Sequence, residues 1–215
     1  MKHFVVLGGP QASGKSSCIK SFNEFVLNLY PCLPKKKDIT LFCLQEARQI
    51  IVHKYHAMGA IFLTPEQEKE IIETDFQRMK VINEELDESL VYMDECNIFT
   101  LAHAKAHQVD LIDQYFNRYL KFLKQINAAV IFLDLSLEIS WQRREAIYKS
   151  RLRRFPPELR EDIYRRYHEY LYNLSMLLDE VWGQLTLPKI KISAKEDHFE
   201  IMQKIISFLF EIEVI

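Results

Sequence analysis

The sequence predicts an α/β protein in which a mainly parallel sheet of five strands lies between two layers of helices. Short apolar runs rich in β-branched and aromatic residues alternate with longer amphipathic stretches along the 215 residues. This alternation is typical of parallel strands that are joined by helical crossovers. No internal repeat, low-complexity tract or linker divides the chain. We therefore expect a single three-layer domain over residues 1–215.

The expected elements follow one another in regular order. Strands are predicted at His3–Leu7, Ile39–Leu44, Leu90–Met93, Ala128–Leu135 and Lys189–Ile192. Helices are predicted from near Gly14, over Glu46–Met58 and Thr64–Leu86, after the third strand through Ala106, and over Asp110–Gln125, Glu138–Trp182 and His198–Phe210. The tripeptide Thr64-Pro65-Glu66 has the pattern of a helix start, with a hydroxyl cap, proline at the first position and an acid in the first turn.

Composition and charge narrow the class of protein. Hydrophobic residues at 48% and charged residues at 27% are globular values. The formal net charge of −2 gives no reason to expect nucleic acid or an anionic membrane as a partner. The apolar runs are far shorter than the roughly 20 residues that a membrane helix needs. The four cysteines (Cys18, Cys32, Cys43 and Cys96) show no metal-ligand spacing, which favours reduced thiols and a cytoplasmic location.

The most specific pattern is an eight-residue loop after the first predicted strand. Residues 9–16, Gly-Pro-Gln-Ala-Ser-Gly-Lys-Ser, fit G-x-x-x-x-G-K-[ST] at every fixed position. Such a P-loop wraps a phosphate with its backbone N–H groups, and the following helix presents its positive end to the anion. Lys15 is expected to reach the β- and γ-phosphates of ATP, and the Ser16 hydroxyl to bind Mg²⁺. The residues expected to bind the nucleotide are Gly9, Gln11, Ala12, Ser13, Gly14, Lys15, Ser16 and Ser17.

Three acidic residues follow the second and third predicted strands. Glu46 comes just after the second strand, and Asp94 and Glu95 end the third. Since ligands of a parallel sheet gather at the carboxyl ends of its strands, we expect these acids beside the loop. Asp94 is the candidate for magnesium, and Glu46 is the candidate base that takes a proton from an attacking hydroxyl. Alternatively, Glu46 simply begins a helix, Asp94 is an ordinary loop acid and Glu95 is a surface residue.

A basic segment follows the fourth predicted strand. Residues 143–166 contain nine cationic side chains and only four acidic ones; eight of the nine are arginines, and Pro156-Pro157 interrupts the segment. Because arginine binds phosphate in a bidentate manner, we expect an arginine-rich lid over about 143–157. Arg143, Arg151 and Arg153 are its best candidates for stabilising the transferred phosphate. The alternatives are a solvated basic helix face and a nucleic-acid patch, and the aromatic residues here are expected to pack rather than to stack on bases.

In their order along nearly the whole chain, these features resemble the deoxynucleoside kinase and thymidylate kinase group of P-loop kinases. Glu46 is similar to the catalytic base of deoxynucleoside kinases. Phe76-Gln77 is similar to the pair that holds the base of their substrate, which implies a substrate contact for Gln77 as well as for Glu46. Asp94 falls at the acidic position of the third strand end. The run from Phe132 to Arg143, with the arginines after it, looks like the fourth strand and arginine lid of the group.

The chain departs from this group at two positions. The group has arginine directly after the acid of the third strand, where this chain has Glu95, and deoxynucleoside kinases usually have proline where this chain has Ala47. The Glu-Ala-Arg sequence at residues 46–48 is also similar to a broad group of poorly characterised P-loop ATPases and kinases. Residues 192–195, Ile-Ser-Ala-Lys, are similar to the guanine loop of GTPases, but no Asn-Lys-x-Asp accompanies them. Lys195 is therefore expected beside an adenine ring, or else at a simple helix entry.

Together these observations predict a kinase that binds ATP and Mg²⁺ and transfers the γ-phosphate to a small acceptor, a nucleoside or a nucleotide. Catalysis is expected to come from positioning and charge neutralisation. The alternatives are an ATPase without a small acceptor and a nucleotide-dependent regulatory or binding module. No nucleic acid or membrane partner is expected, and a homodimer is left open.

Overall fold

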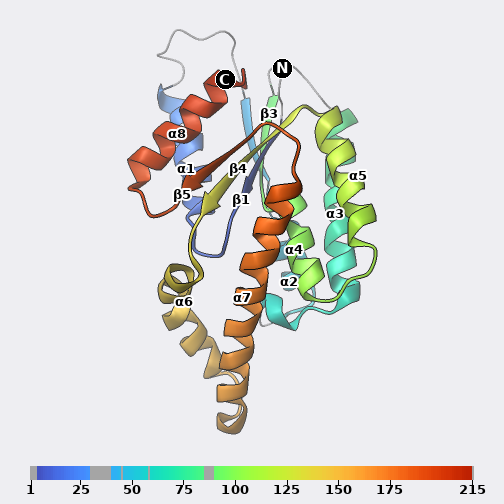
Figure 1. The fold of residues 1–215 in the computed structure, drawn as a ribbon, viewed down its shortest axis with the longest axis vertical. Helices are drawn as coiled ribbons and strands as arrows, with labels where there is room; N and C mark the ends of the chain where they lie inside the picture. Colours follow the sequence, from blue (N-terminus) through green and yellow to red (C-terminus); the bar gives the residue numbers. More distant parts are fainter. Residues whose placement is uncertain (1–3, 30–39, 45, 58, 85–89, 215) are drawn as a thin grey trace.

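A parallel sheet forms the centre of the molecule (Figure 1). The computed structural model describes residues 4–29, 40–44, 46–57, 59–84 and 90–214. The strands are β1 (Phe4–Gly8), β2 (Thr40–Leu44), β3 (Leu90–Glu95), β4 (Ala128–Asp134) and β5 (Lys189–Ser193). They form one five-stranded sheet in the order β2-β3-β1-β4-β5, and every neighbouring pair is parallel. The carboxyl ends of all strands therefore meet at one edge, as the sequence predicted.

The helices alternate with the strands. They are α1 (Lys15–Glu24), α2 (Ala47–Lys54), α3 (Pro65–Glu84), α4 (Thr100–Ala106), α5 (Ile112–Gln125), α6 (Leu137–Leu152), α7 (Arg160–Gln184) and α8 (His198–Glu211). Short turns of other helix types are η1 (Phe25–Leu29), η3 (Ala60–Phe62), η4 (Asn97–Phe99) and η5 (Pro157–Leu159). The predicted bounds His3, Ile39, Met58 and Leu86, and also Cys32, lie outside the described residues.

The start of α3 confirms the helix signal read from the sequence. The Thr64 hydroxyl accepts a hydrogen bond of 3.3 Å from the backbone N–H of Gln67, and the Gln67 side chain accepts one of 2.9 Å from the N–H of Thr64. This reciprocal pair satisfies two backbone donors that a helix start otherwise leaves without partners. The cap therefore fixes the point at which the chain enters α3.

Two apolar cores cover the two faces of the sheet. In β1, Phe4 and Val6 belong to a core with residues of α3, α4, α5 and α7. Val5 and Leu7 belong to a second core with residues of α1 and α8. Figure 1 shows these helices as two layers on opposite sides of the sheet. Because successive strand residues point to opposite faces, a strand that is apolar at every position is what a sheet covered on both faces requires.

Helices α6 and α7 form a hairpin that extends past the carboxyl ends of the strands (Figure 1). The predicted helical stretch Glu138–Trp182 is thus two helices, and the break lies at Pro156-Pro157 as expected. Aromatic side chains join the two helices: the Tyr148 and Tyr167 rings stack at 4.8 Å, and the Trp141 and Tyr164 rings meet edge to face at 5.1 Å. The prediction that aromatic residues of this segment pack is confirmed.

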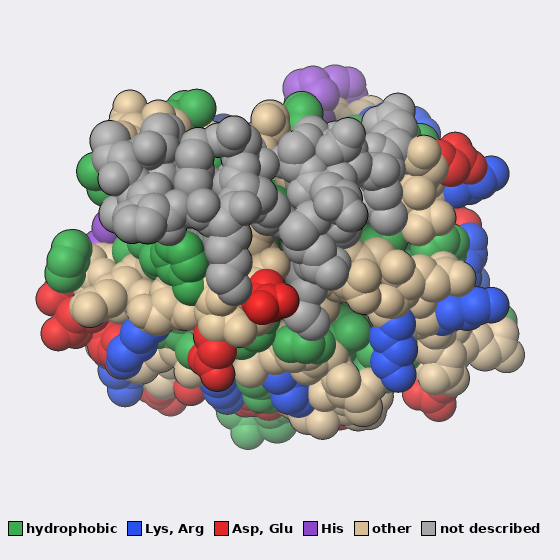
Figure 2. Space-filling model, turned by 90° about the horizontal axis from the view of Figure 1, so that it is seen from above, with side chains coloured by type: hydrophobic (Ala, Val, Ile, Leu, Met, Phe, Trp, Pro, Cys, Tyr) green, Lys and Arg blue, Asp and Glu red, His purple; other side chains and the backbone are tan. Residues whose placement is uncertain are grey.

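The opposite end of the molecule is seen in Figure 2. On the part of this end that the structure describes, acidic and basic side chains are interspersed around the rim with apolar ones. Within the described residues, no helix combines the length and apolar character that crossing a membrane would take.

Candidate nucleotide-binding site

The loop between β1 and α1 has a backbone that only glycine can adopt at two positions. Gly9 has φ of +135°, and a Cβ atom there would lie 2.4 Å from the carbonyl oxygen of Leu133. Gly14, which caps α1, has φ of +94°. Side chains at these positions would be strained, and at Gly9 would also clash with β4. The two fixed glycines of the sequence pattern thus shape a loop that ends in the N-terminus of α1, where backbone N–H groups favour an anion.

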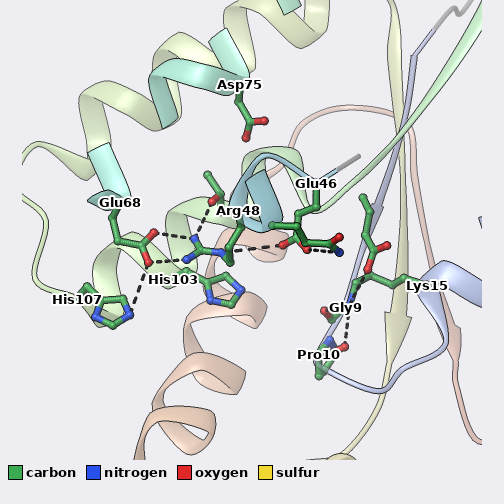
Figure 3. A network of polar contacts seen from close by, with 12 residues as sticks. Gly9, Pro10, Lys15, Glu46, Arg48, Glu68, Asp75, His103 and His107 are labelled. Carbon is green, nitrogen blue, oxygen red and sulfur yellow. Dashed lines mark hydrogen bonds and ion pairs between the residues drawn. The ribbon is translucent and has the colours of Figure 1, made fainter. Parts of the chain in front are cut away.

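Lys15 lies over this loop. Its Nζ atom donates hydrogen bonds of 2.9 Å to the carbonyl oxygens of Gly9 and Pro10, and it lies 4.0 Å from Oε1 of Glu95 (Figure 3). The positive charge of Lys15 therefore lies beside the loop, as the sequence pattern predicts.

Glu95, and not Asp94, is the acid of β3 that faces the loop. Oε2 of Glu95 accepts a hydrogen bond of 2.9 Å from the Ser16 hydroxyl. Asp94 is buried on the other side, where it accepts hydrogen bonds from Asn97 at 2.9 Å and from Arg78 at 3.3 Å. The expectation that Asp94 reaches the nucleotide and magnesium is corrected by this placement, because neighbouring strand residues point to opposite faces.

A cavity of about 780 Å³ opens beside the loop. Its lining includes most of the residues expected to bind the nucleotide, together with Glu46 and Glu95. Glu46 precedes α2, and burial raises the pKa of its carboxyl, while the positive charges of Arg48 and Lys15 oppose this rise. The structure thus brings the predicted base and the predicted phosphate loop into one cavity. Of the predicted loop residues, Gly9, Gln11, Ala12, Gly14, Lys15, Ser16 and Ser17 line it, whereas Ser13 is buried behind it.

Helix α6 contributes two of its arginines to the cavity. Arg144 and Arg151 line it, and the spacing of seven residues places them on one face of the helix. Between them, the Tyr148 hydroxyl donates a hydrogen bond of 2.6 Å to the Gln11 side chain, which docks this face on the loop. Arg153 is exposed beyond the end of α6 and is not among the described residues that line the cavity.

Arg143 has another role than the one expected for it. Its guanidinium donates to the carbonyl oxygens of Ala12, at 3.0 Å, and Ala194, at 3.2 Å. It therefore ties the phosphate loop to the loop that follows β5, and it is absent from the described lining of the cavity. Lys195 comes next to Ala194 in the same loop, but its side chain is exposed and also lies outside that lining.

The predicted substrate contact of Gln77 is not supported by its position. Gln77 lies on the exposed face of α3 and is outside the described lining of the cavity. Its neighbour Phe76 is buried in the core, where its ring lies 4.5 Å from the ring of Tyr119. The buried face of α3 instead presents Asp75, which pairs with Arg78 at 3.1 Å and accepts a hydrogen bond from Tyr119.

Sequence reasoning missed several residues of the cavity. Five residues that were not candidates also line it: Arg48, His53, His56, His103 and Arg144. A helical spacing of four and seven residues links Arg144, Tyr148 and Arg151, and this signal alone could have grouped them. The histidines carry no pattern in the sequence that distinguishes them from surface residues.

The oxygen ligands at the loop fit magnesium. Mg²⁺ prefers oxygen ligands and commonly takes one or two from protein, with the rest from phosphates and water. The Ser16 hydroxyl and the Glu95 carboxylate lie within hydrogen-bond distance of each other at the loop, and both are ligands of this kind. Among the residues that the structure describes, no group of three or more His, Cys, Asp and Glu side chains is placed to hold a metal ion. The fit is therefore to a magnesium ion that is bound together with phosphate.

Among known proteins, the chain matches solved structures and shares their fold. No protein-family model matches the chain, and no curated protein matches it. Solved structures do match, among them the YorR protein from Bacillus subtilis in complex with phosphorylated GDP, with 15% identity and a TM-score of 0.56 over 98% of this chain and 96% of that one. Deoxyadenosine kinase from M. mycoides with bound dATP matches with 15% identity and a TM-score of 0.53 over 96% of this chain and 98% of that one.

The chain shares the fold of these two proteins, one of which is a deoxyadenosine kinase. The resemblance predicted from the sequence is thus confirmed for the fold, and it covers nearly the whole of both similar chains.

Proposed function

We propose that this protein is a kinase that transfers the γ-phosphate of ATP to a hydroxyl group of a nucleoside or a nucleotide. The observation that carries the proposal is that the Glu46 carboxylate lines the same cavity as Lys15 and Ser16 of the phosphate loop. A base and a phosphate site within one cavity are what transfer to an acceptor hydroxyl requires. The volume of about 780 Å³ is in the range of sites for small ligands.

The phosphates of ATP would lie on the loop. The backbone N–H groups at the start of α1 and the Lys15 ammonium would bind the β- and γ-phosphate oxygens. Magnesium, held by Ser16 and Glu95 together with phosphate oxygens, would neutralise charge on the transferred group. Lys15 already lies between the loop carbonyls and Glu95, so a phosphate would exchange one set of oxygen acceptors for another.

Glu46 would act on the acceptor. Its carboxylate would take the proton of the acceptor hydroxyl as that oxygen bonds to the γ-phosphorus and the bond to the ADP oxygen breaks. Burial raises the pKa of this carboxyl, and a raised pKa makes a carboxylate a better proton acceptor. Arg144 and Arg151 face the cavity from α6, where they would stabilise the phosphate oxygens that gain charge.

The solved neighbours support a nucleoside or a nucleotide as the acceptor. One is by name a deoxyadenosine kinase and holds dATP, and the other holds phosphorylated GDP. Both share their fold with this chain over nearly its full length.

A ligand screen followed by a turnover assay tests the proposal. Nucleosides and nucleoside monophosphates are screened for a rise in melting temperature with Mg²⁺ and a non-hydrolysable ATP analogue present, because a ligand that binds the folded state stabilises it. Each compound that raises the melting temperature is then added to the protein with ATP, and ADP release is measured. We expect ADP release to depend on the acceptor.

The Glu46→Gln variant separates a kinase from an ATPase. It is expected to bind the ATP analogue normally and to lose about 10²–10⁴-fold of the acceptor-dependent kcat. Glu84→Gln, the same change at an exposed end of α3, is the control and should behave like the wild type. ADP release that is independent of any acceptor, and unchanged in Glu46→Gln, would overturn the proposal in favour of an ATPase.

A further inference from the structure

Arg48, two residues after the proposed base, is fixed by partners on two other helices. It is the second residue of α2, and only 5% of its surface is exposed. Its two terminal nitrogens pair with the two carboxylate oxygens of Glu68 in α3, one of them at 2.7 Å. One of these nitrogens also donates to the Thr100 hydroxyl of α4 at 2.8 Å. A two-pronged contact of this kind fixes the plane of a guanidinium as well as its position.

The remaining donor of this guanidinium is directed at Glu46. Nε of Arg48 is buried and has no hydrogen-bond partner among the described residues. It lies 4.0 Å from Oε1 of Glu46, which Figure 3 shows on the side of Arg48 opposite Glu68. A buried N–H group without a partner is costly, and the carboxylate that lies within ion-pair distance of this one is that of the proposed base. The arrangement is therefore a carboxylate, a guanidinium and a second carboxylate in one row.

Stability alone does not account for such a row. Glu68 is fully buried and Thr100 nearly so, and a buried ion pair stabilises a fold no better than well-packed apolar side chains of the same volume. Apolar residues in fact fill the adjoining contact between α2 and α3, where Ala47, Ile51, Leu63 and Ile71 form a small core. What the ion pair supplies, and apolar packing cannot, is a fixed positive charge behind Glu46.

We propose that Arg48 is a positioning residue for Glu46, and that Glu68 and Thr100 hold Arg48 in place for this task. The inference rests on the proposed function, since it assigns to Arg48 a role in the action of the base. Arg48 would hold the Glu46 carboxylate toward the cavity and keep it ionised when substrates exclude water. Glu68 would keep the guanidinium from turning fully onto Glu46 and quenching the base.

Burial and neighbouring groups on several elements set the charge state of Glu46, and the carboxyls of Asp75 and Asp94 also interact with it electrostatically. Burial raises the pKa of its carboxyl first, and the Glu95 carboxylate adds to the rise. The Arg48 guanidinium, the Lys15 ammonium and a hydrogen bond from Gln49 lower the pKa. Removal of the Arg48 charge should therefore raise the pKa of Glu46. Removal of the Glu68 charge should lower this pKa, because the positive charge of Arg48 then acts on Glu46 without a second carboxylate to offset it.

The test measures the pH profile of acceptor-dependent kcat in three variants. Since the base must be ionised, activity rises with pH through the pKa of Glu46. Arg48→Gln should shift this acid limb to higher pH by about 1 pH unit, and Glu68→Gln should shift it to lower pH by a similar amount. Arg48→Lys keeps the charge without the fork, so it should restore the position of the limb and only part of kcat.

Two further variants separate positioning from stability. Arg48→Met combined with Glu68→Met replaces the ion pair by apolar side chains that can pack. This double variant should shift the acid limb to higher pH as Arg48→Gln does, and it provides the test if Arg48→Gln does not fold. Ile71→Val loosens the same contact between α2 and α3 without a change of charge, and it should leave the limb where the wild type has it.

Each outcome supports or contradicts the positioning role of Arg48, or contradicts the proposed function. Opposite shifts in the Arg48 and Glu68 variants, with no shift in Ile71→Val, would support the positioning role. An unmoved limb in folded, active variants of both residues, or the same shift in Ile71→Val, would overturn it while leaving the kinase intact. If the wild type itself shows no acceptor-dependent turnover, it is the proposed function that fails.

Discussion

The Ser16 hydroxyl of the phosphate loop donates a hydrogen bond of 2.9 Å to the Glu95 carboxylate at the end of β3. The neighbouring Asp94 lies behind the sheet edge, in contact with Arg78 and Asn97. Two acids that are adjacent in the sequence thus have different surroundings, and only one of them has its oxygens at the loop.

The first prediction concerns this pair. Glu95→Gln should raise the Mg²⁺ concentration needed for half-maximal turnover by about tenfold, because a neutral amide is a weaker magnesium ligand than a carboxylate. Asp94→Asn is the matched control, since it also replaces a carboxylate by an amide, at the adjacent residue whose side chain lies away from the loop. Its Mg²⁺ requirement should equal that of the wild type. Magnesium titrations of steady-state turnover measure both, and the reverse result would restore Asp94 as the ligand.

A second prediction concerns Lys15. Lys15→Ala should fold normally and lose nearly all ATP turnover, since the loop has no other side chain that brings a positive charge to the phosphates. Circular dichroism checks the fold, and ADP release measures turnover. Lys20→Ala removes an exposed lysine from the same helix and should leave turnover unchanged. Turnover like that of the wild type in folded Lys15→Ala would mean that the loop does not bind catalytic phosphates.

A third prediction separates the arginines of the hairpin. Arg144→Ala and Arg151→Ala should each lower kcat by about 10²-fold with little change in KM, because both face the cavity and would act on charge that develops during transfer. Arg153→Ala removes an exposed arginine that lies outside the described lining, so its kcat should stay within about twofold of the wild type.

The arginine series also has a clear contrary outcome. If Arg153→Ala lowers kcat as much as the other two substitutions, then this segment takes up another arrangement during turnover. If instead all three variants keep kcat and lose a salt-sensitive affinity for polynucleotide, the hairpin is a nucleic-acid patch.

The fourth prediction concerns stability and pH. Burial raises the pKa of Asp75 from an ordinary value of 3.8 to about 8, the Asp94 charge adds to the rise, and Arg78 opposes it. Below pH 3.8 the carboxyl is protonated in both states. As pH rises toward 8 only the unfolded chain releases the proton, so the folded state loses stability over this window.

Asp75→Asn removes this titration and should flatten the pH dependence. Between pH 5 and pH 8, the free energy of unfolding of the wild type should fall by about 1–3 kcal/mol more than that of the variant. Urea unfolding at the two pH values measures the difference. Glu84→Gln, which neutralises an exposed acid on the same helix, should follow the wild type, and equal slopes in Asp75→Asn and wild type would contradict the prediction.

The local features of the fold could be predicted from the sequence. The phosphate loop depends on two glycines within eight residues, and the start of α3 depends on Thr64 and Gln67, three residues apart. Strands appear as short apolar runs because both faces of the sheet are covered. Each of these signals lies within a few residues of its effect, so the sequence shows it directly.

The identity of the site residues depends on contacts that span the chain. Asp94 lies opposite Val6 and Leu44 within the sheet, while Glu95 lies one residue farther along, opposite Leu7, and this alternation decides which acid meets the loop. In α6, the turn of 3.6 residues directs Arg143 to the Ala12 and Ala194 carbonyls and Arg144 to the cavity.

The sequence by itself therefore determined that the chain folds as a parallel α/β protein with a loop suited to phosphate. Only the tertiary structure decided that Glu95 faces Ser16, that Arg144 and Arg151 share the cavity, and that Arg48 is fixed behind Glu46. The physical reason is that a strand or helix pattern states which residues share a face, whereas the packing of distant elements sets where that face points.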